Sequence, residues 1–191
     1  MNVHFTASNY QLEKHIDDYR SIVDAVKKQG HTMTREWLEE DLGRRTTKSS
    51  YSPTEYKEIW QKVKMSILSA DVVIVDGSIN SFSIGYQTAF ALSNKKPVLV
   101  MTSDHEISQT IIAGEDNPLL FIKNYTTKNL ESVVNEFLNK FNIAKQDMRF
   151  NMFIDRETQA FLEIESYKTG KTKAKIIRDM IKKEIQNKNG L

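Results

Sequence analysis

The chain has 191 residues, of which 39% are hydrophobic and 27% are charged, and its formal net charge is +2. These values are typical of a soluble globular protein with one core, or with one domain and a small module. The absence of cysteine excludes disulfides, thiolate nucleophiles and cysteine-based metal sites. The sequence begins without a signal-like segment and has no apolar run of membrane-spanning length, so we expect a cytoplasmic protein without a membrane partner.

The first third of the chain alternates between strand-like and helix-like segments. "NVHFT" predicts a short strand, and the apolar positions from Ile16 to Val26 predict a helix over residues 11–28 that Gly30 ends. "HTMT" is a second strand candidate, and the polar stretch "EEDLGRRTTKSSYSP" indicates a long loop. Thr54 is the expected N-cap of a helix over residues 55–69.

The middle of the chain supplies the clearest strands. "DVVIV", "PVLVM" and "PLLFI" are continuous apolar runs, with helices expected over residues 84–92, near Ser108 and over residues 127–141. Such runs indicate a parallel sheet that is covered on both faces. We therefore predict a small doubly wound α/β domain, Rossmann-like or flavodoxin-like, over residues 1–142. Ligands of such a domain bind beyond the carboxyl ends of the strands.

The pattern changes after "NIAKQ". "MRFNMFID" alternates over one strand length, "RETQAFLEIESYKTG" is an amphipathic helix ended by Gly170, and a second helix follows with Thr172 as its expected N-cap. From Ile143 onward 11 Lys and Arg stand against 7 Asp and Glu, whereas the earlier residues carry 16 against 18. This asymmetry suggests a basic module over residues 147–191, although a basic run is also typical of a solvated helix face.

The order strand, helix, glycine, helix resembles the ribbon-helix-helix DNA-binding family from Met148 to about Glu184. So small a module cannot fold alone, and the resemblance implies a homodimer, or a tetramer built from it, whose paired strands enter the major groove. It places Phe150, Met152 and Ile154 in the dimer core. The residues that it directs to DNA are Arg149, Asn151, Phe153, Lys171, Thr172, Lys173 and Lys175. The alternative is a dimerisation clasp that does not contact DNA.

Four segments of the first domain carry a second resemblance: "NVHFTAS", "YRSIV", "ADVVIVDGSINSFSIGYQTAFALSNKKPVLVM" and "ISQTIIAG". They resemble nucleoside 2-deoxyribosyltransferase-like domains, and within these the deoxynucleoside 5′-monophosphate N-glycosidases. The resemblance implies a nucleotide-like ligand, with Ser81, Ser83 and Gly85 around its phosphate and Ser108 donated across a dimer. The full set of ligand-binding candidates is Ser8, Asn9, Tyr19, Asp76, Ser81, Ser83, Gly85, Gln87 and Ser108. The serines can also be read as ordinary turn residues.

The two carboxylates of this family are missing, because the aligned residues are Gln87 and Val63. An amide is neither a nucleophile nor a negative charge for an oxocarbenium-like centre, and valine cannot transfer a proton. The sequence therefore predicts a pocket that binds without cleaving. Asp76 is the best candidate for a substitute acid. The other candidates, Glu39, Glu40, Asp41, Glu55 and Glu58, can equally be capping or surface acids.

Three hypotheses follow. The main one is a DNA-binding regulator with a catalytically degenerate nucleotide-sensing domain. The second is an active N-glycosidase or deoxyribosyltransferase acting on nucleotides or NAD, resembling phage-defence effectors, and the third is an assembly protein whose small module only pairs subunits. The four histidines show no metal-ligand spacing, so neither a metal nor a cofactor is expected.

Overall fold

The computed structural model describes residues 1–45, 51–103, 111–142 and 151–189. The chain forms two compact units, Met1–Ala144 and Lys145–Leu191. No helix within the described ranges combines the length and apolar composition needed to cross a bilayer.

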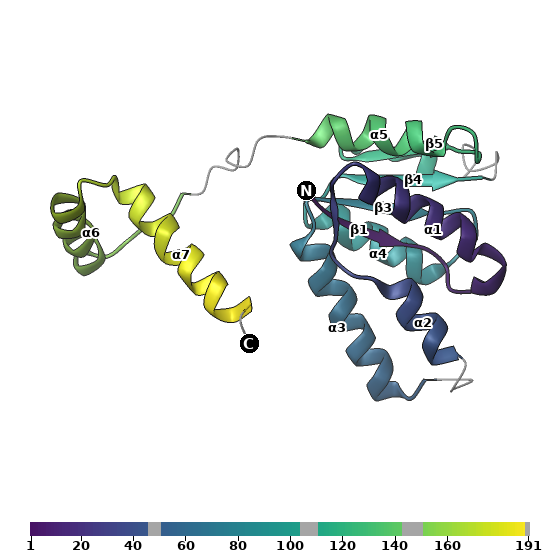
Figure 1. Ribbon diagram of the computed structural model, residues 1–191, viewed down its shortest axis with the longest axis horizontal. Helices are drawn as coiled ribbons and strands as arrows, with labels where there is room; N and C mark the ends of the chain where they lie inside the picture. The colour runs from purple at the N-terminus through teal and green to yellow at the C-terminus, as the bar shows by residue number, and fades with distance from the viewer. Residues whose placement is uncertain (46–50, 104–110, 143–150, 190–191) are drawn as a thin grey trace. The chain divides into compact units, whose positions relative to one another are not determined.

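The first unit is built on a parallel sheet with the strand order β2-β1-β3-β4-β5 (Figure 1). All residues of β3 and β4 are buried, which explains why these strands are unbroken apolar runs in the sequence. This order is flavodoxin-like and confirms the predicted doubly wound α/β fold. The strands are β1 (Asn2–Thr6), β2 (Thr32–Met33), β3 (Val72–Asp76), β4 (Val98–Thr102) and β5 (Leu120–Asn124).

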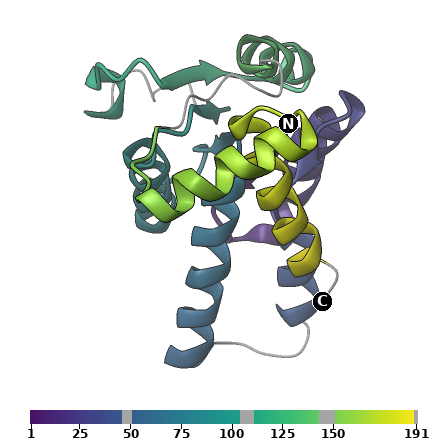
Figure 2. The ribbon, with the colours of Figure 1, turned by 90° about the vertical axis from the view of Figure 1, so that its left-hand side faces the viewer.

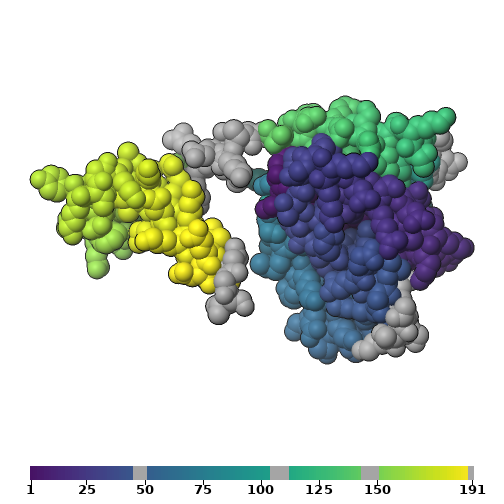
Figure 3. All heavy atoms as spheres, in the orientation of Figure 1, coloured from purple at the N-terminus to yellow at the C-terminus, as the bar shows by residue number. Residues whose placement is uncertain are grey.

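Helices cover the sheet on both faces, with α1 in front of the strands and α4 behind them in Figure 1. One apolar core joins the sheet to α1 (Leu12–Lys28), α2 (Trp37–Arg45) and α5 (Leu130–Phe141). The other joins it to α3 (Pro53–Ser69) and α4 (Phe82–Ser93). The side chains of α1, α2 and α5 cover the strands on the face seen in Figure 3. Alternate residues of β3 divide between the two cores, as the strand period of two requires.

Two local expectations differ from the structure. The predicted polar loop contains most of α2, because Trp37 anchors this helix by packing in the first core and donating from Nε1 to the Phe5 carbonyl at 2.9 Å. Helix α3 begins earlier than expected, because Ser52 and Glu55 form a reciprocal capping box with proline at the first helical position. Thr54 therefore lies inside the helix. The short helix expected near Ser108 falls outside the described residues.

The described part of the second unit contains two helices, α6 (Arg156–Thr169) and α7 (Lys173–Asn189), which contact each other and diverge at a wide angle (Figures 1 and 2). Gly170 joins them in the left-handed conformation, at φ 65°, that favours glycine at a helix end. The Thr172 hydroxyl accepts from the Lys175 amide at 3.3 Å, as expected of an N-cap. Residues 148–150 of the predicted strand lie outside the described ranges, and residues 151–155 form no strand within the described chain.

Candidate ligand-binding site

The sheet offers one place where its connections diverge. The chain leaves β1 toward the α1 face and leaves the adjacent β3 toward the α4 face. In doubly wound sheets, ligands bind in the crevice at such a switch point. The first connection carries Ser8 and Asn9, and the second leads to Ser81, the N-cap of α4. Both connections start from the same edge of the sheet, at the carboxyl ends of two adjacent strands.

Gln87 lies at this edge, half-buried on α4 and turned toward β1. Its side-chain oxygen accepts a hydrogen bond from the Thr6 hydroxyl at 3.0 Å. This hydrogen bond fixes the carbonyl end of the amide on Thr6, and the same side chain also interacts with the buried His4. Thr6 was not among the predicted site residues. The available signal was the pair of polar side chains, His4 and Thr6, that alternate within an otherwise apolar strand.

His4 forms a buried polar chain beneath Gln87. Its Nδ1 lies 2.7 Å from the Ser66 hydroxyl, which in turn lies 2.6 Å from the Thr34 hydroxyl. Burial lowers the pKa of His4 to about 4, so the imidazole is neutral at pH 7. Its other nitrogen, Nε2, is buried without a hydrogen-bond partner among the described residues, although the Gln87 amide is close enough to oppose the pKa shift.

Val63 occupies a packing position. It is buried in the second core, together with Val75 on the sheet and Ile84 on α4. A carboxylate here would be surrounded by apolar side chains and would lose its hydration. The position therefore contributes to stability, and it offers no group that could exchange a proton.

Asp76, the candidate substitute acid, points to the opposite face of the sheet from Gln87. One carboxylate oxygen accepts from the Tyr125 hydroxyl at 2.5 Å, and the other accepts from the Ser78 amide at 2.9 Å. Tyr125 belongs to the core on the α1 and α5 face. Burial raises the pKa of the Asp76 carboxyl, against the effect of these two hydrogen bonds. The side chain is 1% exposed, so it acts as a structural clamp between β3 and the end of β5.

Tyr19 and Ser8 shape the turn after β1. The Tyr19 ring is buried edge-on against Phe5, and its hydroxyl donates to the Ser8 carbonyl at 3.2 Å. Burial, together with the nearby Asp76 charge, raises the pKa of Tyr19 far above its usual value, so the hydroxyl stays protonated. The Ser8 hydroxyl accepts from the Tyr10 amide at 3.2 Å. The structure thus gives both residues local contacts, and neither contacts Gln87 within the described chain.

The first turn of α4 carries the predicted phosphate-binding residues. Ser81 is the N-cap, yet its side chain makes no capping hydrogen bond. Ser83 is exposed, and nothing lies within 4 Å of the place where a Cβ on Gly85 would be. The backbone of this turn is thus accessible to an anion. Sequence reasoning missed Ser78, whose hydroxyl accepts from the Ser103 amide at 3.0 Å and so ties together the loops after β3 and β4. Ser108 lies outside the described residues.

The other candidate acids have local partners or stay at the surface. Glu39 pairs with Arg20, and Asp41 accepts from the Tyr51 hydroxyl. Glu55 forms the α3 capping box, and Glu58 is exposed on the same helix. Glu40 forms ion pairs with three cations, Arg35, Arg44 and Lys62. Within the described residues, no group of three His, Asp or Glu side chains is arranged to hold a metal ion.

The predicted DNA-binding residues of the second unit are exposed wherever they are described. Lys171 pairs with Asp179 at 2.8 Å and Lys173 pairs with Glu163 at 2.9 Å, so two of the expected cations are partly neutralised. Asn151, Phe153, Thr172 and Lys175 are exposed to solvent. Arg149 lies outside the described residues.

No family model matches the chain, and no curated protein matches its sequence. Among solved structures, a CMP N-glycosidase from Clostridium botulinum is similar over 74% of this chain and all of its own, with 10% sequence identity and a TM-score of 0.47.

Proposed function

We propose that the protein is a DNA-binding regulator whose α/β domain binds a nucleotide-like ligand without cleaving it. One observation carries the second half of this proposal: the half-buried residue at the centre of the candidate site is the amide of Gln87, held by Thr6. The sequence resemblance places a carboxylate at this position in glycosidases.

The chemistry of glycosidic cleavage explains why this substitution is decisive. The reaction needs an ionised carboxylate to attack or stabilise the anomeric carbon and an acid or base to assist the leaving group. Gln87 carries no charge, and Val63 is part of the apolar core. Asp76 lies on the other face of the sheet with both oxygens hydrogen-bonded. These placements support a site that binds its ligand and leaves the bond intact.

The ligand class follows from the groups at the sheet edge. The accessible first turn of α4, with hydroxyls at Ser81 and Ser83, suits a phosphate group. The Gln87 amide supplies a donor beside this turn, which suits the polar edge of a base or sugar. A nucleoside monophosphate combines both features, and a related phosphosugar combines most of them.

The second unit supports the regulatory half of the proposal. Among its described apolar residues, only Leu162 and Ile176 are buried, while nine large apolar side chains are exposed. A second copy of the module would cover such a surface. The exposed cations Lys175, Arg178 and Lys182 are spaced along one side of α7, where they can meet a phosphate backbone. Ligand binding would act on DNA affinity to the extent that it favours one arrangement of the dimer.

Ligand binding is tested by thermal unfolding with a panel of nucleoside monophosphates. We expect at least one to raise the Tm, and we expect Gln87→Ala to abolish the shift. Gln61→Ala, an exposed amide on α3, is the matched control and keeps it. Release of free base from deoxynucleotides or NAD at an enzymatic rate, lost in Asp76→Asn, would establish the enzyme hypothesis instead.

DNA binding is tested with the full chain by fluorescence anisotropy at several salt concentrations. We expect a steep salt dependence, and Lys175→Gln should reduce the slope of log K against log salt by about 1. Lys57→Gln, an exposed lysine on α3, should leave the slope unchanged. A chain that dimerises without salt-dependent DNA binding is an assembly protein.

A further inference from the structure

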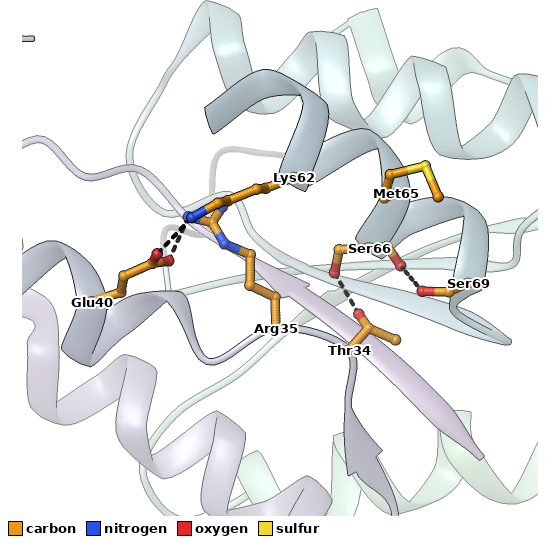
Figure 4. Close-up of a pocket in the computed structure, with 7 residues that line it drawn as sticks. All are labelled: Thr34, Arg35, Glu40, Lys62, Met65, Ser66 and Ser69. Atoms are coloured by element: carbon orange, nitrogen blue, oxygen red, sulfur yellow. Dashed lines mark hydrogen bonds and ion pairs between the residues drawn. The ribbon is translucent and has the colours of Figure 1, made fainter. Parts of the chain in front are cut away.

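A hollow of about 420 Å³ lies between α2 and α3, and the function proposed above makes no use of it (Figure 4). Arg35 and Glu40 reach it from the end of β2 and from α2, and Lys62, Ser66 and Ser69 reach it from α3. The polar side chains drawn in Figure 4 gather into a charged end and a hydroxyl end, and the Met65 thioether lies at the hydroxyl end. We call this hollow the α2–α3 groove.

The charged end has more cations than anions. The Glu40 carboxylate accepts from Arg35 at 2.9 Å, from Arg44 at 2.9 Å and from Lys62 at 3.2 Å. Burial alone would raise the pKa of Glu40, but the hydrogen bonds from Arg35 and Lys62 lower it below its usual value, so Glu40 is ionised at neutral pH. Arg35 and Lys62, the two cations that line the groove, therefore share a single carboxylate, and the lining has an excess of positive charge.

Arg35 shows that this end lacks an acceptor. Its side chain is 17% exposed, and its Nε is buried with no hydrogen-bond partner among the described residues. A buried donor that is left unpaired costs free energy comparable to a lost hydrogen bond. The rest of the guanidinium lines the groove, where an anionic ligand would offer it acceptor oxygens.

The hydroxyl end supplies polar oxygen atoms next to the cations. Thr34 and Ser66 lie side by side with their hydroxyls 2.6 Å apart, and the Ser69 hydroxyl donates to the Ser66 carbonyl at 3.1 Å. In Figure 4 these hydroxyl groups lie at one end of the groove and the cations lie at the other end. A phosphate at the cations would leave its esterified group beside the hydroxyls.

We propose that the α2–α3 groove binds a phosphate monoester, with Arg35 and Lys62 on the phosphate and the hydroxyls of Thr34 and Ser69 beside the esterified group. In the chain without ligand, the Glu40 carboxylate pairs with the cations that would bind the phosphate. This site is separate from the Gln87 site and does not depend on the function proposed for it.

The test is calorimetric titration of the full chain with inorganic phosphate at constant ionic strength. We expect saturable binding that Lys62→Gln weakens about tenfold, the effect of losing one charge-assisted hydrogen bond. Lys57→Gln removes an exposed lysine of the same helix outside the groove, and it should bind as the wild type does. Equal affinity in Lys62→Gln and wild type, or heats that do not saturate, would overturn the proposal.

Glu40→Gln gives a change of opposite sign. Removal of the internal anion should tighten phosphate binding in a chain whose circular dichroism spectrum is unchanged, and a folded variant that binds no more tightly contradicts the site.

Gln87→Ala separates the two sites, since it should leave phosphate affinity unchanged. If Gln87→Ala abolishes phosphate binding while Lys62→Gln does not, the groove is not the site and the function proposed for Gln87 stands. Titration with a sugar phosphate and a nucleoside monophosphate then shows which ester binds more tightly than phosphate alone.

Discussion

The two units of the chain differ in where they bury their apolar residues. In the first unit, both faces of the sheet are packed under helices, and strands such as β3 and β4 are buried throughout. In the second unit, the helices α6 and α7 bury Leu162 and Ile176 and leave Met180, Ile181 and Ile185 more than half exposed. The first unit thus has a core of its own, whereas the second has only part of one.

This difference separates two sources of stability within one chain. The hydrophobic contribution scales with the apolar area removed from water, and in the first unit that area is removed by the chain itself. In the proposed dimer the second unit removes it by pairing with a second copy, so we expect its stability to depend on protein concentration. Changes to the two units should therefore appear in different measurements.

The largest expected effect is the loss of self-association in Ile181→Glu. We expect the dimer dissociation constant to rise about a hundredfold or more, because an unpaired carboxylate buried at an interface costs about 3–5 kcal/mol. Sedimentation velocity over a range of concentrations measures it. Gln186→Glu introduces the same carboxylate on another side of α7 and should remain dimeric. An Ile181→Glu chain that stays dimeric would show that this part of α7 is not in the interface.

The second effect concerns the first unit alone. Val63→Asp should lower its free energy of unfolding by about 3 kcal/mol, because it places a carboxyl in an apolar core. Urea denaturation followed by circular dichroism measures the loss, which should not vary with protein concentration. Gln61→Asp, an exposed change on the same helix, should be nearly neutral. A stable Val63→Asp chain would mean that this position tolerates the acid of the glycosidases.

The smallest effect is the acid sensitivity that His4 gives to the first unit. Its pKa is about 4 when folded and near 6.5 when unfolded, so the unfolded chain binds the proton first as the pH falls. The stabilisation that neutral His4 gives to the folded state is complete above the unfolded pKa. It is lost as the pH falls from the unfolded pKa to the folded pKa. Between pH 7 and pH 5 this amounts to about 2 kcal/mol.

Urea denaturation measures the free energy of unfolding at pH 7 and pH 5. The loss of this free energy between the two pH values should be smaller in His4→Gln than in the wild type by that amount. His15→Gln, on the partly exposed face of α1, is the control and should keep the full difference. An unchanged pH dependence in His4→Gln would show that the buried imidazole is not the group responsible.

The sheet could be predicted because its signals are local. The runs at β3 and β4 are apolar at every position, and only a parallel sheet with both faces covered explains them. The same property concealed the direction of Asp76, because a strand that is apolar on both faces does not show which face its last residue joins. Helix α2 was missed because it is held by the distant contact between Trp37 and Phe5.

The candidate site itself stays a prediction, to which the structure adds contacts. Gln87 follows from its place in the turn-to-helix segment after β3, and the structure adds its contact with Thr6. The chain from His4 through Ser66 to Thr34 joins three segments far apart in sequence, and one sequence contains no signal of that pairing. The strand expected over residues 148–155 stays a prediction, because residues 148–150 lie outside the described ranges and residues 151–155 form no strand in the described chain.

The buried series of hydrogen bonds from Thr34 through Ser66 to His4 also has a direction, which the positions of the protons set. Each hydroxyl has one proton to give, so the two hydroxyls can point toward the imidazole or away from it, and the tautomer of His4 follows. In one tautomer Nε2 carries hydrogen next to Gln87, and in the other it presents a lone pair. A ligand that rotated the Thr34 hydroxyl would switch the tautomer of His4 without moving a heavy atom. Gln87 would then face a lone pair on Nε2 in place of a hydrogen, or the reverse.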